Sequence, residues 1–280
     1  MEAAKFMDWA IALLTEIDTT PDKLAWCRQY SVYAPNAGQE ALVRELRTLF
    51  HQTYEFSLVI SNYGKVIDYW GLDEQEIAAA DPVWLEQQPY LCVLASIAWH
   101  FRRDHFCEGS LIHDSIASGA LLRLFRRLKA LCPTAAPAVT LHELIGNNCQ
   151  SSPEVPGVYW VLVPEGMTIS FTKEVRNQHA PLYPVETLLQ KYENCTEREV
   201  LYIGKAEGAG GLRQRLKQYM KYGQGEGHIH KGGRAIWQIE NAGLLLLAYE
   251  PCDHAESREK QLLREYKARN DTYPLANWRS

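Results

Sequence analysis

The sequence lacks the features that are typical of membrane-spanning proteins, of secreted proteins and of proteins with a structural metal site. No apolar run reaches the length needed to cross a bilayer, and the first residues lack a signal peptide's charged start and apolar core. The seven cysteines are scattered, odd in number and never spaced as Cys-x-x-Cys, which argues against a disulfide framework or a structural zinc site. We therefore expect reduced, mostly buried thiols in a cytoplasmic protein that has no membrane partner.

The sequence also lacks a net positive charge and any internal repeat. Its 280 residues suffice for one large or two ordinary domains, and the net charge of −5 does not by itself indicate a nucleic-acid partner. The charge is uneven, however. From residue 153 onward 17 Lys and Arg stand against 16 Asp and Glu, whereas 12 stand against 18 before it. A local positive field in the second half is therefore compatible with phosphate binding.

The first half has the apolar periodicity of helices. Stripes of apolar residues predict helices over 2–17, 38–53, 91–106 and 111–131, and Asp81-Pro82 is a typical helix start. The prolines and small residues of 132–137 predict a linker. We predict a helical domain over residues 1–145, with a possible role in target recognition or partner binding, and place the boundary within 133–153.

The second half, residues 146–280, is predicted to be mixed. Clusters of β-branched and aromatic residues indicate strands at 157–163, 200–205, 235–240 and 243–249, with a possible return strand at 167–171. Helical patterns cover 184–192, 212–222 and 256–269. The expected fold class is α+β, in which a small, mainly antiparallel sheet is flanked by helices.

Two short motifs in the second half indicate a function. The first is Gly157-Val158-Tyr159 and the second is Tyr202-Ile203-Gly204; Arg215, Glu259 and Asn277 follow in that order. Together these residues resemble the GIY-YIG nuclease family, with Val158 as a conservative variant of the usual isoleucine. The resemblance covers roughly the last 125 residues and implies a nuclease that cleaves DNA, with RNA not excluded.

The resemblance implies a catalytic role for six residues. Tyr159 and Tyr202 match the family's paired tyrosines, which orient or deprotonate the attacking water and position the phosphate. Arg215, rather than Arg213, matches the arginine that faces the scissile phosphate, and Tyr219 occupies the position that follows it. Glu259 matches the ligand of Mg²⁺ or Mn²⁺, a role for which one carboxylate is chemically sufficient. Glu256 and Glu265 are chemical rivals, and Asn277 matches a hydrogen-bonding brace.

Further residues are candidates for substrate binding. Gly204 and Lys205 lie at the end of a predicted strand, and the basic helix 212–222 carries Arg213 and Lys217. The polar segment 227–234 adds His228 and Arg234, which could face DNA as backbone donors and cations. The sequence departs from the family in one respect: residues 164–199 are inserted between the half-motifs. Such an insertion leaves the fold possible but leaves substrate choice and the insertion's own role open.

Each residue also has an ordinary structural interpretation. A tyrosine in a strand usually packs in the core, Gly204 could be a simple turn, and a lone glutamate is usually solvated. Two other classes of function therefore stay open: a catalytically inactive nucleic-acid-binding module, and an adaptor that binds a protein through the acidic helical half. The dense segment His100–Ser110 faintly resembles an uncharacterised helical domain of bacterial proteins, which implies no activity. Oligomeric state and biological setting, DNA repair or phage defence, are not indicated.

Overall fold

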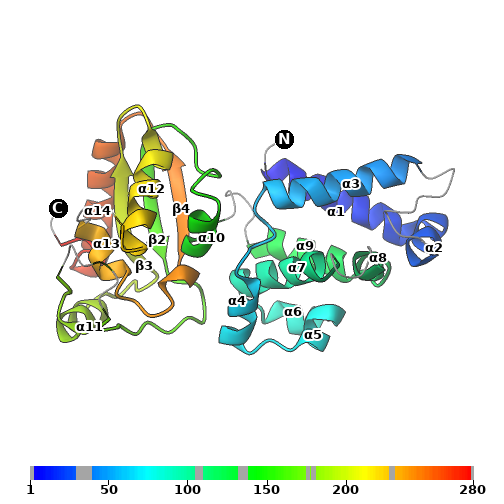
Figure 1. Ribbon diagram of the computed structural model, residues 1–280, viewed down its shortest axis with the longest axis horizontal. Coiled ribbons are helices and arrows are strands. Elements are labelled where there is room, and N and C mark those ends of the chain that lie inside the picture. The colour runs from blue at the N-terminus through cyan, green and yellow to red at the C-terminus, as the bar shows by residue number, and fades with distance from the viewer. Residues whose placement is uncertain are drawn as a thin grey trace. The chain divides into compact units, whose positions relative to one another are not determined.

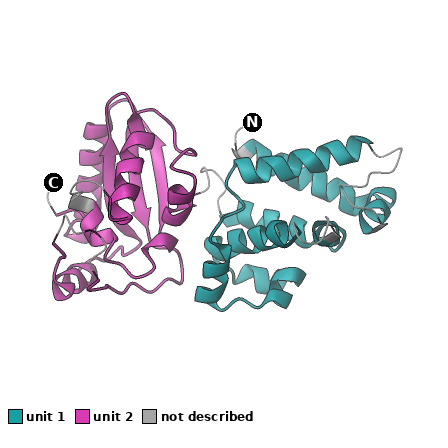
Figure 2. Cartoon of the chain, in the orientation of Figure 1, with its two compact units in different colours: residues 1–137 teal, residues 138–280 magenta. Residues whose placement is uncertain are grey.

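The computed structural model describes residues 3–29, 40–104, 110–131, 138–174, 177, 181–226 and 231–278. The chain divides into two compact units, residues 1–137 and residues 138–280 (Figure 2). The predicted linker at 132–137 lies outside the described residues. The division also comes earlier than the boundary expected after residue 145, because a strand and a helix directly after residue 138 pack within the second unit.

The described part of unit 1 consists of helices and their connections, as the apolar periodicity predicts. Helix α7 is its core: twelve of its fifteen residues are buried, including Ser96 and His100. Apolar stripes of the neighbouring helices pack against it (Figure 1). The helices are α1 (Ala3–Thr19), α2 (Pro21–Gln29), α3 (Glu40–Glu55), α4 (Tyr63–Trp70), α5 (Glu74–Ala79), α6 (Pro82–Glu86), α7 (Tyr90–Asp104), α8 (Ser110–Ala117) and α9 (Ala120–Leu131).

One helix predicted in this unit is in fact two. The range 111–131 breaks after Ala117, where Gly119 adopts a left-handed φ of 73° and donates its N–H to the Ile116 carbonyl. Glycine adopts this conformation without steric cost, so the chain can turn and begin α9 in a new direction. The helix start at Asp81-Pro82 is correct, because the Asp81 carboxylate accepts from the Val83 and Trp84 N–H groups.

Unit 2 has a four-stranded antiparallel sheet in the order β1-β4-β2-β3, so the α+β class is confirmed. Figure 1 shows α12 in front of the strands and α14 behind them. The register places Tyr159 opposite Gly204. The elements are β1 (Val139–Thr140), α10 (Leu141–Gly146), β2 (Gly157–Leu162), α11 (Val185–Glu193), β3 (Val200–Ala206), α12 (Gly211–Gly223), α13 (Lys231–Ile236), the 3-10 helix η1 (Ala242–Leu244), β4 (Leu246–Pro251) and α14 (Ala255–Asn270).

Two of the predicted strands are wrong and a third is displaced. Residues 235–240 form the end of α13 and a turn, and 167–171 form no return strand; a single bridge joins Phe171 to Ile239. The predicted strand 243–249 begins only at Leu246, after η1. All residues from Ala235 to Ile239 are buried and all but Gln238 are apolar, and a short, mainly apolar run does not distinguish a buried helical turn from a buried strand.

The last residues brace the edge strand β3. The Asn277 amide donates to the Ile203 carbonyl at 2.8 Å, and its oxygen accepts from the Ile203 N–H at 3.0 Å, so one side chain substitutes for a neighbouring strand. Lys191 of α11 holds this C-terminal turn in place by donating to the carbonyls of Pro274, Leu275 and Asn277. The family-based expectation for Asn277 was likewise a hydrogen-bonding brace.

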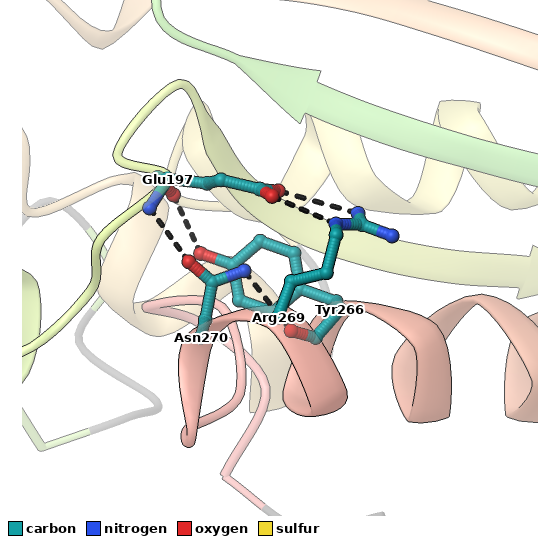
Figure 3. Close-up of polar contacts among 4 residues, drawn as sticks. All are labelled: Glu197, Tyr266, Arg269 and Asn270. Carbon is teal, nitrogen blue, oxygen red and sulfur yellow. Dashed lines mark hydrogen bonds and ion pairs between the residues drawn. The ribbon is translucent and has the colours of Figure 1, made fainter.

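The end of the insertion is anchored on α14 (Figure 3). The Glu197 carboxylate accepts hydrogen bonds from Arg269. The backbone N–H of Glu197 donates to the Asn270 side-chain oxygen at 2.6 Å, and the backbone carbonyl of Glu197 accepts from the Tyr266 hydroxyl at 2.6 Å. This network leads the chain directly into β3 at Val200, so the insertion returns to the sheet in a defined position.

None of the described helices has both the length and the apolar composition needed to cross a membrane.

Candidate active site

Three tyrosines from separate elements converge on one face of the sheet. Tyr159 of β2 and Tyr202 of β3 have ring centroids 5.8 Å apart. Tyr219 of α12 lies 6.1 Å from Tyr202 with nearly parallel rings, and 6.2 Å from Tyr159. Tyr159 and Tyr219 are fully buried, whereas Tyr202 retains 9% of its exposure. We call these three residues the tyrosine cluster; Tyr202 is its member nearest to solvent.

Gly204 makes the tyrosine cluster sterically possible. A Cβ at this position would lie 2.6 Å from Tyr159 Cζ and 2.6 Å from Tyr202 Cε1, distances that real Cβ contacts do not reach. The backbone of β3 is therefore approached directly by both rings. Gly204 was predicted to bind substrate; it is buried and serves instead to let the tyrosines pack across the strand pair.

The basic residues of α12 point in two directions. Arg215 precedes Tyr219 by one helical turn, so both lie on the face toward the tyrosine cluster. Burial raises the pKa of Tyr159 and Tyr202, and Arg215 is close enough to oppose that rise. Arg213 faces the 150–154 loop: it donates to the carbonyls of Ser152 at 2.8 Å and Gln150 at 3.2 Å, and it pairs with Glu154.

The other two basic residues of α12 that were predicted to bind substrate, Arg213 and Lys217, lie toward residues 149–154. The guanidinium of Arg213 is occupied by the loop that it clamps. Lys217, four residues later on the same face, lies close enough to Cys149 to lower that thiol's pKa against the effect of burial. Of these three residues only Arg215 lies close to the tyrosines, and substrate binding by Lys217 stays a prediction.

Glu259 brings a carboxylate to the same place from α14. Helix α14 packs on β3, and the Glu259 carboxylate is close enough to Tyr202 to add to the rise that burial causes in the pKa of that phenol. Burial raises the pKa of the Glu259 carboxyl, Lys205 and Arg215 oppose this shift, and Glu207 and Glu256 reinforce it. Among the described residues no hydrogen bond or ion pair engages the Glu259 carboxylate.

The acidic neighbours of Glu259 are themselves paired. Lys205 lies 3.2 Å from a Glu207 carboxylate oxygen and 3.3 Å from a Glu256 oxygen, and Lys260 pairs with Glu256 at 3.1 Å. The rivals are therefore less suitable metal ligands: Glu256 is exposed and paired, and Glu265, also exposed, accepts from Gln261. Lys205 binds these carboxylates in the structure, at the margin of the site.

Glu259 has the chemistry of a single carboxylate ligand for a divalent cation, but it is not part of a site in which several protein side chains surround the metal. No group of three or more His, Cys, Asp or Glu side chains in the described residues could hold a metal ion. A half-buried carboxylate without a cationic partner, next to two further carboxylates, is the kind of donor that Mg²⁺ uses when waters and substrate supply its other ligands. Glu259, the metal ligand that the resemblance implies, thus has suitable chemistry for this role.

The phenols of the cluster are held in their neutral form. Burial raises the pKa of Tyr159 and Tyr219 well above the ordinary value of 10, with a further increase from the neighbouring phenols. Burial also raises the pKa of Tyr202, while Arg215 partly opposes it. The tyrosines are therefore suited to donate hydrogen bonds, and the alternative in which one of them deprotonates water is disfavoured.

Three other predicted residues lie away from the tyrosine cluster or outside the described chain. Arg234 donates to the Pro181 carbonyl and stacks over Tyr183 at 4.1 Å, so it holds the insertion. Asn277 braces the outer edge of β3. His228 lies outside the described residues, as do the other residues of 227–230, the first half of the 227–234 segment that was expected to face DNA.

Two residues of the site's surroundings were missed. Trp237 lies 6.1 Å from the Tyr219 ring and packs behind the cluster; no local sequence signal predicts a contact between residues so far apart. Glu207 follows β3 immediately, so its place near Lys205 could have been inferred from the strand end. In unit 1, His100 is buried against Ser115 at 2.6 Å, and the remaining cluster of residues 105–109 lies outside the described chain.

Comparison with known proteins adds no relative. No protein-family model matches the chain, and neither a curated protein nor a solved structure matches it significantly.

Proposed function

We propose that this protein is a metal-dependent endonuclease that hydrolyses phosphodiester bonds in DNA. The observation that carries the proposal is the convergence of Tyr159, Tyr202, Tyr219, Arg215 and Glu259 around the end of β2 and β3. They come from four elements spread over a hundred residues of sequence. Their chemistry combines hydrogen-bond donors, a cation and a carboxylate, which are the groups that in-line phosphoryl chemistry requires.

In this proposal each residue has a distinct role. Arg215 binds non-bridging oxygens of the scissile phosphate, since its guanidinium can donate to two of them and stabilise the charge that grows in the transition state. Tyr202, the most exposed phenol of the cluster, donates a hydrogen bond to the phosphate or orients the attacking water. Tyr159 and Tyr219 support Tyr202 from below, because both are fully buried.

Glu259 would hold Mg²⁺ or Mn²⁺, with waters and phosphate oxygens completing the coordination. When bound, the cation would act as a Lewis acid on the phosphate. The raised pKa of the Glu259 carboxyl makes its occupancy dependent on pH, because only the ionised form is a good ligand.

Unit 1 would direct or restrict the nuclease. It carries 12 Lys and Arg against 17 Asp and Glu, whereas unit 2 carries 17 of each. A unit of charge −5 repels phosphate over most of its surface, so general DNA affinity is expected to reside in unit 2. The setting proposed is the cytoplasm.

A catalytically inactive nucleic-acid-binding module is the second candidate, and the strong burial of Tyr159 favours it, since that phenol is poorly placed to act as a base. The test is incubation of the full chain with single-stranded, duplex and branched DNA and with RNA, in Mg²⁺, Mn²⁺ or EDTA. The nuclease predicts cleavage of DNA that requires metal. Retention of DNA without cleavage in any metal supports the inactive module, and no retention of nucleic acid argues for a protein adaptor.

A further inference from the structure

A cleft in unit 1, remote in sequence from the tyrosine cluster, combines carboxylates with exposed apolar groups. It has a volume of about 520 Å³ and lies between α5 and α6, which Figure 1 shows beside one another. Its lining includes Asp73 and Glu76 on one side and Asp81, Val83 and Trp84 on the other. Val83 is 68% exposed, the most exposed large apolar side chain among the described residues.

The cleft is preformed, because both helices are fixed from behind. Arg123 of α9 donates to the carbonyls of Ala79 and Ala80 at the end of α5, at 2.9 and 2.8 Å. Arg127, one turn later, donates to the carbonyls of Glu86 and Gln88 at the end of α6. A ligand would therefore find the two walls already in position, which lowers the entropic cost of binding.

The carboxylates retain acceptor capacity. Asp73 and Asp81 each cap a helix through Oδ1 alone, so each has a second oxygen that the cap does not use. Glu76 is exposed beside them. The residues that line the cleft include three carboxylates and no Lys, Arg or His, while the neighbouring Arg103 is paired with Glu74 and the Arg123 and Arg127 guanidinium groups are bonded to backbone carbonyls. The lining itself is therefore acidic. Phosphate is repelled here and a cationic group is attracted.

We propose that the cleft between α5 and α6 binds a protein partner through a short amphipathic segment rich in lysine or arginine. Cationic side chains of that segment lie against Asp73, Glu76 and Asp81, and an aliphatic side chain covers Val83. The Trp84 ring offers a face for a cation or for its methylene stem. An apolar surface rimmed by charge is typical of a protein contact. This inference is independent of the proposed nuclease activity.

The test uses a fluorescein-labelled helical peptide of leucine and lysine as the probe and the full chain as receptor, read by anisotropy at low and moderate salt. Glu76→Arg combined with Val83→Ser is expected to weaken binding about tenfold, from the loss of one ion pair and one apolar contact. The matched control, Glu193→Arg with Leu189→Ser on α11, makes the same charge reversal and a similar apolar-to-serine change at exposed positions of unit 2, and it is expected to leave binding unchanged.

Three results would overturn the proposal. They are equal binding by the double variant and the parent, equal binding of a probe in which glutamate replaces lysine, and no binding of the lysine probe at all. Displacement by spermidine at concentrations matched to the probe would identify the cleft as a polyamine site instead. Circular dichroism of each variant checks folding, and the charge-reversed probe tests the cleft with the unaltered protein.

Discussion

At the scale of single residues, the decisive feature is which partners each charged side chain has; Arg215, for example, donates to the exposed Gln218 side chain on its own helix. Arg215 and Arg213 are two positions apart on a basic helix, yet Arg213 is used up by the 150–154 loop while Arg215 faces the tyrosines. Glu259 is likewise half-buried without an ion pair among the described residues, whereas Glu256 pairs with two lysines. The role of a charged residue therefore depends on the partners that its side chain already has, as much as on its residue type.

Glu259→Gln is expected to abolish metal-dependent DNA cleavage and to leave the fold intact. The amide is isosteric but carries no charge, so it is a poor ligand for a hard cation. Cleavage rates of the purified variant in Mg²⁺ test this, with Glu256→Gln as the matched control one turn earlier. If Glu259→Gln cuts as fast as the parent, Glu259 is not the metal ligand.

Arg215→Ala and Arg213→Ala are expected to separate catalysis from stability. Loss of Arg215 removes an electrostatic stabiliser of the transition state and should lower turnover by about 10²–10³ with little change in melting temperature. Loss of Arg213 leaves the carbonyls of Gln150 and Ser152 without their donor and should mainly lower the melting temperature. Single-turnover rates and thermal melts of both variants decide; the reverse pattern would contradict the assignment.

His100 should make unit 1 sensitive to acid. Burial lowers its pKa from the ordinary 6.5 to about 4, so as pH falls through this window the unfolded chain takes up a proton that the folded chain does not. Stability is therefore lost between pH 6.5 and 4, by roughly 3 kcal/mol at most. His113, also buried with a lowered pKa, adds to the same trend.

The measurement is the change in melting temperature between pH 7 and 4 for the parent, His100→Gln and the exposed control His51→Gln. Only His100→Gln is expected to flatten the dependence, whatever its effect at neutral pH. An unchanged slope would mean that His100 is already protonated in the folded chain.

At the scale of elements, β3 is the strand on which the site depends, and it is an edge strand. Its inner side pairs with β2, and its outer side is completed by the Asn277 side chain and the Ala276 N–H. Ile203, which Asn277 holds, lies between Tyr202 and Gly204 and packs against Leu263 of α14. The position of the tyrosine cluster therefore depends on a residue at the far end of the chain.

Asn277→Ala is expected to lower the free energy of unfolding by roughly 2–4 kcal/mol, because both backbone groups of Ile203 lose their partners in a buried setting. Activity should fall with it, since β3 carries Tyr202. Chemical denaturation of the variant tests this, with Asn194→Ala, at an exposed position after α11, as control. A change no larger than that of the control would show that water replaces the brace.

At the scale of the whole molecule, the boundary at residue 138 has a practical consequence. Residues 138–280 are expected to fold alone, and residues 150–280 to be markedly less stable. The shorter fragment loses β1, which pairs with β4, and α10, whose Leu141 and Leu144 are fully buried. Thermal melts of the two fragments compare them directly, and equal stability would place the true boundary later.

The longer fragment should bind DNA at low salt as well as the full chain or better, because removing unit 1 removes a charge of −5. Salt-titrated binding of the fragment and of the full chain measures this. A folded fragment without DNA affinity would show that the helical unit carries the affinity.

The sequence by itself determined the elements with strong periodicity or clear ends: α7, the start of α6 at Asp81, β2, β3, α12 and α14. The motifs also identified the tyrosines, Arg215 and Glu259 as candidate site residues, because the order and spacing of motif residues can be seen in the sequence itself. The sequence did not distinguish strand from helical turn at 235–239, since a short, fully buried run has no polar alternation to read.

Tertiary structure alone decided which groups are engaged and which phenols are buried. Arg213 donates hydrogen bonds to a loop some sixty residues earlier in the sequence. Tyr159 is fully buried, and β1 pairs with a strand more than a hundred residues later. Each of these contacts joins segments far apart in sequence, and its energy depends on packing and desolvation that exist only once the sheet and its helices have assembled.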